Sequence, residues 1–246
     1  MLTLDRLGEE TLNRIATLAL SSQLDDARKL NVQVKTDPSL LAKGQLESLT
    51  IYGEGLIMEH DIRLQEMVIR LETIAVAPFK ALTGNIVLTQ PTEGTARIVI
   101  AQADLNRAFN SDVLGTQFRS LQVQVDGKSQ TLNVKQVNCR LLAEGRVGLD
   151  ADVRLSQSNQ TQRVSFTTTP RVSDDGRSVV LEKVEYAHGK ELSPELTQAL
   201  VAKAGKILHL SHFEMPGISL QMHYLEVQEG QLTLQAVAHV TQFPSV

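Results

Sequence analysis

The sequence predicts an α+β protein in which antiparallel strands make up most of the chain. An apolar stripe at helical spacing opens the 246-residue chain, and a second helical segment lies near residue 200. Elsewhere hydrophobic residues alternate with polar ones in short segments joined by turn residues. A helix followed by a meander of strands favours an antiparallel sheet over alternating βαβ units.

The first predicted element is an amphipathic helix. Glu9 and Glu10 are expected in its first turn, where the helix dipole favours negative charge, and the charged segment 25–29 marks its end. Its apolar residues recur three and four positions apart and form one stripe: Leu12, Ile15, Ala16, Ala19, Leu20 and Leu24. We expect this helix to be anchored by that single buried face.

Period-two alternation then predicts strands over residues 30–34, 46–51 and 62–71. In the third of these, Ile62 and Leu64 share one parity, whereas Met67, Ile69 and Leu71 share the other. Such a switch predicts a β-bulge, which sharpens the twist and curvature of a sheet. Short helices at 78–82 and 102–110 and strands near 86–88 and 97–100 complete the first half.

The second half is predicted to be a meander with one helix. Asp126 and Gly127 form a strong hairpin-turn signal, and alternating segments continue to residue 186. Ser193, Pro194 and Glu195 then open a helix as N-cap, first-position proline and first-turn acid, and two closing strands follow at 218–222 and 232–240. No linker rich in Pro, Gly or Ser divides the chain, so we expect a single domain over residues 1–246.

Composition excludes several classes of protein. The chain has 24 Lys and Arg against 28 Asp and Glu without a basic block, so we expect no nucleic-acid partner. A single cysteine, Cys139, excludes intrachain disulfides and multi-cysteine metal sites. Charge at Asp5 and Arg6 is unlike a signal peptide, and no apolar run reaches the about 18 residues of a membrane span. We therefore expect a cytoplasmic protein or one peripheral to the inner or thylakoid membrane.

No catalytic motif is present: the sequence has no P-loop, dinucleotide fingerprint, G-x-S-x-G or H-E-x-x-H. His209 and His212 could place two imidazoles on one metal if both lay on a helix, with His223 further along. No third ligand stands at a recognised spacing, so the favoured interpretation is that the helix ends near Leu210 and leaves two partly exposed histidines. We predict no enzymatic activity, no metal and no cofactor, and a hydrolase or metal enzyme is the least favoured alternative.

The hydrophobic residues are almost all aliphatic. The chain has no Trp, six Phe and three Tyr, although 42% of its residues are hydrophobic. An interior with few rigid rings suits an ordinary packed core, and it also suits a cavity that accepts acyl chains. Each CH₂ group moved from water into such a cavity is worth about 0.8 kcal/mol.

Four stretches resemble the LmeA-like phospholipid-binding proteins of bacterial cell envelopes, above all their cyanobacterial branch. They are GEETLNRIATLALSSQLDDARKLNVQVKTDP, GQLESLTIYGEGLIMEHDIRLQEMVIRLETIAV, LTQPTEGTARIVIAQADLNRAFNS and GKELSPELTQALVAKAGKILHL. The resemblance implies a non-enzymatic binder of acidic phospholipid that serves membrane or envelope maintenance. It also implies a fold like tubular lipid-binding domains, in which a strongly curved antiparallel β-sheet wraps around a long amphipathic helix.

Apolar parity, rather than any motif of that family, gives the predicted binding residues. We expect an aliphatic groove between the first helix and the third strand, lined by Leu12, Ile15, Ala19, Met67, Ile69 and Leu71. Arg14, Arg63 and Arg70 are the residues we expect to hold head groups, and the expected partners are phospholipid and, peripherally, a membrane surface. The alternative is a lipid-free scaffold or interaction domain with packed aliphatic faces; the sequence indicates no particular protein partner.

Overall fold

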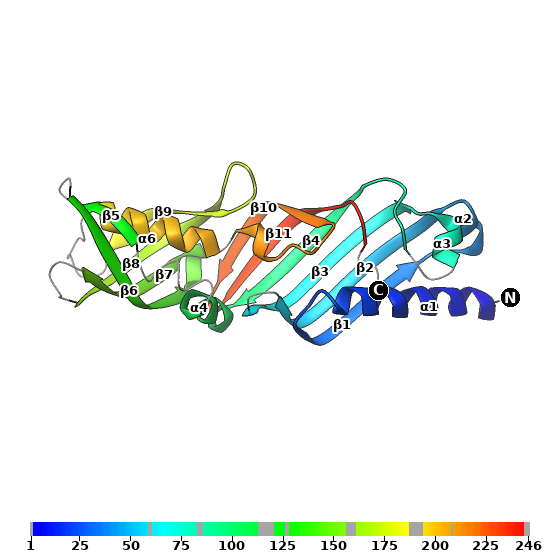
Figure 1. Cartoon of the computed structure of the whole chain (residues 1–246), viewed down its shortest axis with the longest axis horizontal. Helices are drawn as coiled ribbons and strands as arrows, with labels where there is room; N and C mark the ends of the chain where they lie inside the picture. Colours follow the sequence, from blue (N-terminus) through cyan, green and yellow to red (C-terminus); the bar gives the residue numbers. More distant parts are fainter. Residues whose placement is uncertain are drawn as a thin grey trace.

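The computed structural model describes residues 2–58, 61–82, 86–112, 121–125, 128–155, 161–186, 194–207 and 209–243. Its strands form two open antiparallel sheets that lie end to end in an elongated molecule (Figure 1). Helices accompany both sheets, so the predicted α+β class with antiparallel strands is confirmed. The sequence predicts one sheet around one helix; the strands instead divide between two sheets, each with helices of its own.

The first sheet has six strands in the order β1-β2-β3-β4-β11-β10. The last two strands of the chain thus return to pair with β4 and complete a sheet begun by the first four. Every neighbouring pair is antiparallel. The bounds are β1 Asp26–Lys35, β2 Gln45–Met58, β3 Ile62–Ala75, β4 Thr92–Ala101, β10 Ile218–Gln228 and β11 Gln231–Val240.

The second sheet is a meander of five strands, β5 to β9, in chain order. Asp126 and Gly127 lie outside the described residues, but Val125 and Lys128 on either side of them pair with each other. The bounds are β5 Leu121–Val125, β6 Lys128–Leu141, β7 Val147–Leu155, β8 Thr161–Val172 and β9 Val179–Tyr186.

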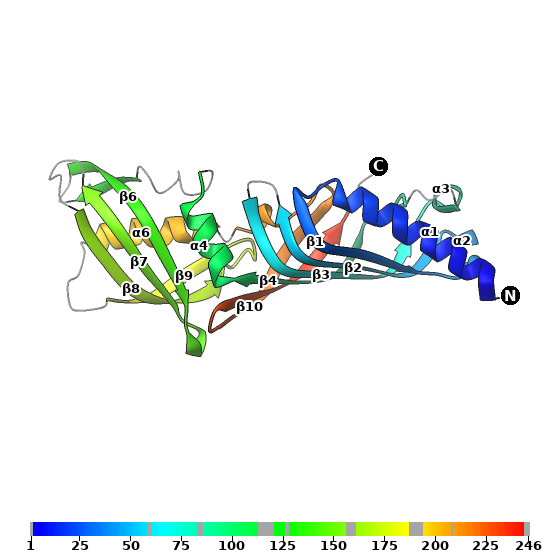
Figure 2. The same ribbon diagram turned by 90° about the horizontal axis from the view of Figure 1, so that it is seen from below.

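Five α-helices and two 3₁₀ turns connect or cover these strands within the described ranges. Figure 2 shows α1 and α6 on the same side of the two sheets, α1 along the six-stranded sheet and α6 inside the curve of the five-stranded one. The bounds are α1 Leu2–Ser21, α2 Pro38–Ala42, α3 Pro78–Leu82, α4 Gln102–Asn110, η2 Ala143–Gly145, α6 Pro194–Ile207 and η4 Leu210–His212. Among the described residues, no helix combines the length and apolarity that crossing a bilayer requires.

Three details of these elements differ from the prediction. Because α1 begins at Leu2, Glu9 and Glu10 lie in its middle rather than its first turn, and Leu24 lies beyond its end at Ser21. Residues 86–88 form only an isolated bridge, in which Leu88 pairs with Val76, instead of a strand. The predicted N-cap Ser193 lies outside the described residues.

Side chains of α1 accept hydrogen bonds from the backbone N–H groups at the open edge of β1. Glu9 Oε1, Asn13 Oδ1 and Thr17 Oγ1 accept hydrogen bonds from the backbone N–H groups of Thr36, Val34 and Val32, at 3.0, 2.6 and 3.2 Å. Four helical residues advance about 6.0 Å and two strand residues about 6.6 Å, so acceptors four apart on a helix match donors two apart on a strand. The helix thereby replaces a missing neighbouring strand and protects the edge from pairing with another chain.

The same arrangement recurs where α4 lies along β6. Gln102 Oε1 accepts from Leu141 N at 2.7 Å, and the amides of Asn106 and Asn110 each bond both the N–H and the C=O of one strand residue, Cys139 and Val137 respectively. The spacing is again four on the helix and two on the strand. Both sheets therefore carry a helix whose polar side chains close a strand edge.

The predicted change of parity in β3 is present, but the predicted bulge is not, because the register between β2 and β3 is the same on both sides of the change. Ile62 and Leu64 are buried on one parity and Met67 on the other, while the residues between Leu64 and Met67 are not buried. Glu54 and Leu56 of β2 pair with β3, whereas Gly55 between them has no partner in the register. Gly55 has φ +60°, a conformation that glycine adopts without the steric cost that other residues incur. The bend in the two strands is therefore encoded by a glycine in β2 and a change of parity in β3.

Candidate functional site

The predicted groove residues lie in the core of the six-stranded sheet. Met67, Ile69 and Leu71 are 0%, 1% and 0% exposed. On α1, Leu12 and Ala19 are buried and Ile15 is half-buried. The buried members of both sets belong to one aliphatic core, which is closed to solvent at β3, so a ligand would reach Met67, Ile69 and Leu71 only if this core opened. Their role in lipid binding stays a prediction.

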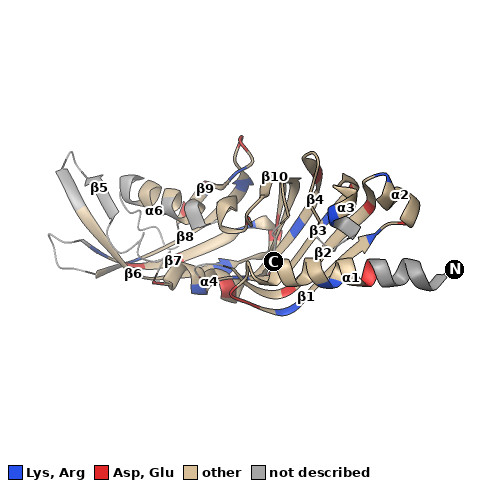
Figure 3. Ribbon diagram, turned by 45° about the vertical axis from the view of Figure 1, so that its right-hand side comes forward, with Lys and Arg blue, Asp and Glu red and all other residues tan. Residues whose placement is uncertain are grey.

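The three predicted head-group arginines lie in different surroundings. Arg14 is exposed on α1, and Arg63 Nε bonds Asp61 Oδ1 at 3.0 Å near the start of β3. Arg70 alternates with Ile69 and Leu71, so it lies on the outer face of the sheet, opposite the core. Along the ribbon, Lys and Arg as well as Asp and Glu occur in both sheets (Figure 3).

An open, mostly aliphatic cavity lies between α6 and β9, the edge strand of the five-stranded sheet. Its volume is about 520 Å³, within the range of about 300–1,000 Å³ usual for small-molecule sites. Sequence reasoning missed this cavity. Its lining consists of Ser178, Val179, Val180, Leu181, Gln198, Val201, Ala202, Gly205 and His209.

Gly205 sets the distance between helix and strand at this cavity. A Cβ at that position would lie 2.5 Å from the carbonyl oxygen of Val179, so only glycine allows the helix backbone to approach this closely. The polar groups of the lining are the hydroxyl of Ser178, the amide of Gln198 and the imidazole of His209. The cavity thus combines an aliphatic wall with a few hydrogen-bonding groups, which is the usual character of a site for an amphiphile.

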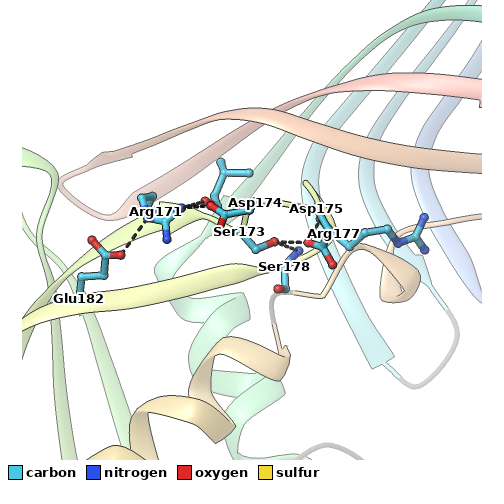
Figure 4. A network of polar contacts seen from close by, with 8 residues as sticks. Arg171, Ser173, Asp174, Asp175, Arg177, Ser178 and Glu182 are labelled. Carbon is cyan, nitrogen blue, oxygen red and sulfur yellow. Dashed lines mark hydrogen bonds and ion pairs between the residues drawn. The ribbon is translucent and has the colours of Figure 1, made fainter.

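The turn between β8 and β9 forms a polar network beside this cavity (Figure 4). Asp175 Oδ1 accepts hydrogen bonds from Ser173 Oγ at 2.5 Å and Arg177 N at 3.0 Å, and Ser173 Oγ accepts from Ser178 N at 2.9 Å. The Ser173 hydroxyl, followed by the Arg177 N–H, lowers the pKa of Asp175 below its ordinary value. The carboxylate therefore stays charged and holds Ser178 in place at the cavity wall.

Arginines tie this turn to its neighbours. Arg171 donates hydrogen bonds to Glu182 of β9 and to Asp174, both at 2.8 Å. These bonds, above all the one to Glu182, raise the pKa of Arg171. Arg177 pairs with Glu214 at 3.2 Å, and Glu214 in turn accepts from Leu220 N of β10 at 2.8 Å. Because each of these arginines pairs with a carboxylate, they hold the start of β9 in place and do not leave an unpaired charge at the cavity entrance.

The histidines adopt the predicted loop arrangement. The helix α6 ends at Ile207, and His209 Nδ1 accepts from Ser211 N at 3.2 Å as the cap of η4. The His209 and His212 rings lie 6.4 Å apart, edge to face, and His223 lies on β10. In the described ranges, no three His, Cys, Asp or Glu side chains are close enough together to hold a metal ion.

A comparison with known protein families gives one match. The profile described as LmeA-like phospholipid-binding matches residues 3–237. This range includes all the described helices and strands except the first residue of α1 and the last three residues of β11. No curated protein matches the chain.

Proposed function

The chain belongs to the LmeA-like phospholipid-binding family, and from this premise we propose that it seats a phospholipid acyl chain in the cavity between α6 and β9. The cavity is the observation that carries the proposal, because it is open to the outside and its wall is formed by Val179, Leu181, Val201 and Ala202. The proposed ligand is an acidic phospholipid, as the resemblance implies. The proposed role is membrane or envelope lipid maintenance, with no chemical step.

The energetics of transfer suit an aliphatic wall. An acyl chain that leaves a bilayer for this cavity exchanges one apolar environment for another, so its free energy changes little. Against water, each enclosed CH₂ group is worth about 0.8 kcal/mol, so even partial enclosure retains a lipid. Such a site can therefore hold a lipid in transit and still release it to a membrane.

The interior beneath α1 is the second location in the proposal. Leu12, Ile15, Ala19 and the β3 residues Met67, Ile69 and Leu71 would line it once α1 separates from β1. The α6–β9 cavity needs no such movement, which is why we place the first acyl chain there.

Contact with a membrane is also part of the proposal, and α3 supports it. Phe79 is 84% exposed, the most exposed large hydrophobic side chain among the described residues. It belongs to α3, which lies near one end of the elongated molecule (Figure 1). Lys80 follows it in α3, and Lys43 lies at the end of the adjacent α2. Exposed aromatic and basic residues together favour insertion into the interface of an anionic bilayer.

Native mass spectrometry of protein purified without detergent tests the proposal. We expect a phospholipid to co-purify, and solvent extraction then identifies its head group. Ala202→Trp, an exposed position in the cavity wall, should fill the cavity and remove most of the bound lipid. Ala103→Trp, equally exposed on α4 and outside the cavity, is the matched control and should retain it.

Two outcomes would count against this account. Retention of lipid by Ala202→Trp would move the acyl chain to the interior beneath α1. A lipid-free mass with no uptake from anionic vesicles would overturn lipid binding and favour a lipid-free interaction domain, which the closed core at β3 also fits.

A further inference from the structure

A second cavity lies on the outer face of the six-stranded sheet. Its volume is about 540 Å³, and it lies on the side opposite Met67, Ile69 and Leu71. Most of its lining residues carry a polar side chain, and they come from five strands, β2, β3, β4, β11 and β10: Thr50, Tyr52, Glu66, Val68, Arg70, Thr95, Ala96, Arg97, His223, Gln235 and Ala236.

Strand register places the polar groups in two adjacent rows. Arg70 lies between Thr50 of β2 and Thr95 of β4, so a hydroxyl flanks its guanidinium on each side. In the next row, Val68 lies between Tyr52 and Arg97, and Arg97 pairs in turn with Gln235. Arg70 and Arg97 are therefore diagonal neighbours on β3 and β4, a separation of about 7–8 Å between their backbones.

The charges of this surface do not balance. Arg97 forms an ion pair with Glu66, and Arg28 with Glu54 at the rim. Among the described residues, neither Arg70 nor Lys29 has an ion-pair partner; Lys29 Nζ lies 5.2 Å from the ring centroid of Tyr52. The lining thus includes one arginine, Arg70, that forms no ion pair with a described residue, and Lys29 lies beside Tyr52 at its rim.

Apart from Glu66, whose carboxylate pairs with Arg97, the polar side chains of the lining can donate hydrogen bonds. Burial, followed by the nearby carboxylates of Glu54 and Glu66, raises the pKa of Tyr52 above its ordinary value, so its hydroxyl stays protonated. The hydroxyls of Thr50 and Thr95 and the amide of Gln235 add neutral donors. Arginine with several neutral donors is the usual set for binding phosphate, because the guanidinium fork matches two phosphate oxygens.

We propose that this outer-face cavity binds a phosphate-bearing anion, with Arg70 as the principal ligand and Arg97, Tyr52 and the flanking threonines as supporting donors. The ligand is either the head group of an acidic phospholipid in a bilayer or a soluble phosphate ester, which share this chemistry. The site is separate from the proposed acyl-chain cavity. It shares no lining residue with the α6–β9 cavity, and the six-stranded sheet separates it from the aliphatic interior that contains Met67, Ile69 and Leu71.

Titration with defined phosphate probes tests the proposal. We would follow backbone amide shifts of the full chain with inorganic phosphate, glycerol 3-phosphate, and vesicles of phosphatidylcholine with or without phosphatidylglycerol, at constant ionic strength set with chloride. Saturable shifts on β2, β3 and β4 are expected. Saturation by soluble phosphate identifies the phosphate group itself as sufficient, and saturation only by phosphatidylglycerol vesicles identifies a bilayer head group.

Variants of exposed arginines provide the controls. Arg70→Ala should weaken binding about tenfold or more, because a charge-assisted bidentate contact is lost. Arg70→Lys keeps the charge without the planar guanidinium, so its affinity should lie between those of the wild type and Arg70→Ala. Arg107→Ala, an exposed arginine on α4, should bind like the wild type. The proposal is overturned if no probe saturates, or if Arg70→Ala binds as tightly as Arg107→Ala; lipid co-purification and its loss in Ala202→Trp test the acyl-chain cavity independently.

Discussion

At the scale of single residues, Cys139 combines burial with a rigid backbone. Its thiol lies in the core of the five-stranded sheet, and burial raises its pKa to about 12 from an ordinary value of 9.0. Because the thiolate is the reactive form, the thiol should be inert at any pH below that value while the sheet is intact.

We therefore expect iodoacetamide at pH 8 to leave the native protein unmodified and to label the protein promptly in concentrated urea. Intact mass measured over time checks this. Labelling of the native protein at the rate of the urea-unfolded chain would mean that β6 opens freely, and would contradict the burial of Cys139.

Residue-level patterns also show what could be predicted about strand geometry. The change of parity between Leu64 and Met67 was visible in the sequence, but the bulge predicted from it is not found, because β2 changes parity at the same place, beside Gly55, and the two strands stay in register. A second irregularity was not predicted: Thr73 has φ +54°, and sequence rules place glycine or asparagine in that conformation rather than a β-branched residue. Tertiary pairing imposes this strain, so no local pattern signals it.

At the scale of elements, α1 and α4 act as substitutes for strands. In α4, the amide of Asn106 makes two hydrogen bonds to the backbone of Cys139, at 2.6 and 2.8 Å. A part-buried N–H or C=O left without a partner costs about 1–3 kcal/mol. The stability of the β6 edge should therefore depend strongly on this one side chain.

Asn106→Ala is expected to lower the free energy of unfolding by about 2 kcal/mol, measured by urea denaturation. Asn138→Ala, an exposed asparagine on β6, is the control and should change it by less than about 0.5 kcal/mol. Equal effects of the two substitutions would mean that the contact between α4 and β6 contributes little.

The helix positions could be predicted, but their function could not. Leu105, Phe109 and the stripe of α1 show where the helices lie, because an apolar face must be buried. In the sequence, the polar residues Gln102, Asn106 and Asn110 resemble a solvent-exposed helix face. Their hydrogen bonds to the backbone of β6 could be predicted only if the open strand edge were already known. The α6–β9 cavity was missed for the same reason, since it depends on the approach of Gly205 to Val179.

At the scale of the molecule, both sheets follow one plan. In each, side-chain oxygens four residues apart on a helix accept hydrogen bonds from strand N–H groups two residues apart, and the helix and strand run in opposite directions. The sequence did not predict two sheets, because β10 and β11 look like a continuation of the meander. They return instead to β4, a pairing set by tertiary contacts between Ala236 and Ala96 and their neighbours.

The proposed membrane contact belongs to one end of the elongated molecule, where α2 and α3 lie together near the N-terminus of α1 (Figure 2). If Phe79 inserts into the bilayer interface, Phe79→Ser should weaken binding to anionic vesicles about tenfold, because burying an aromatic side chain is worth about 1.5–3 kcal/mol. Vesicle co-sedimentation measures this, and added salt should weaken binding further through screening of Lys43 and Lys80. Tyr224→Ser removes a 46% exposed aromatic on β10, away from that end, and should leave binding unchanged. If both variants bind alike, another surface of the molecule contacts the membrane, whereas an effect of Phe79→Ser alone assigns that role to α3.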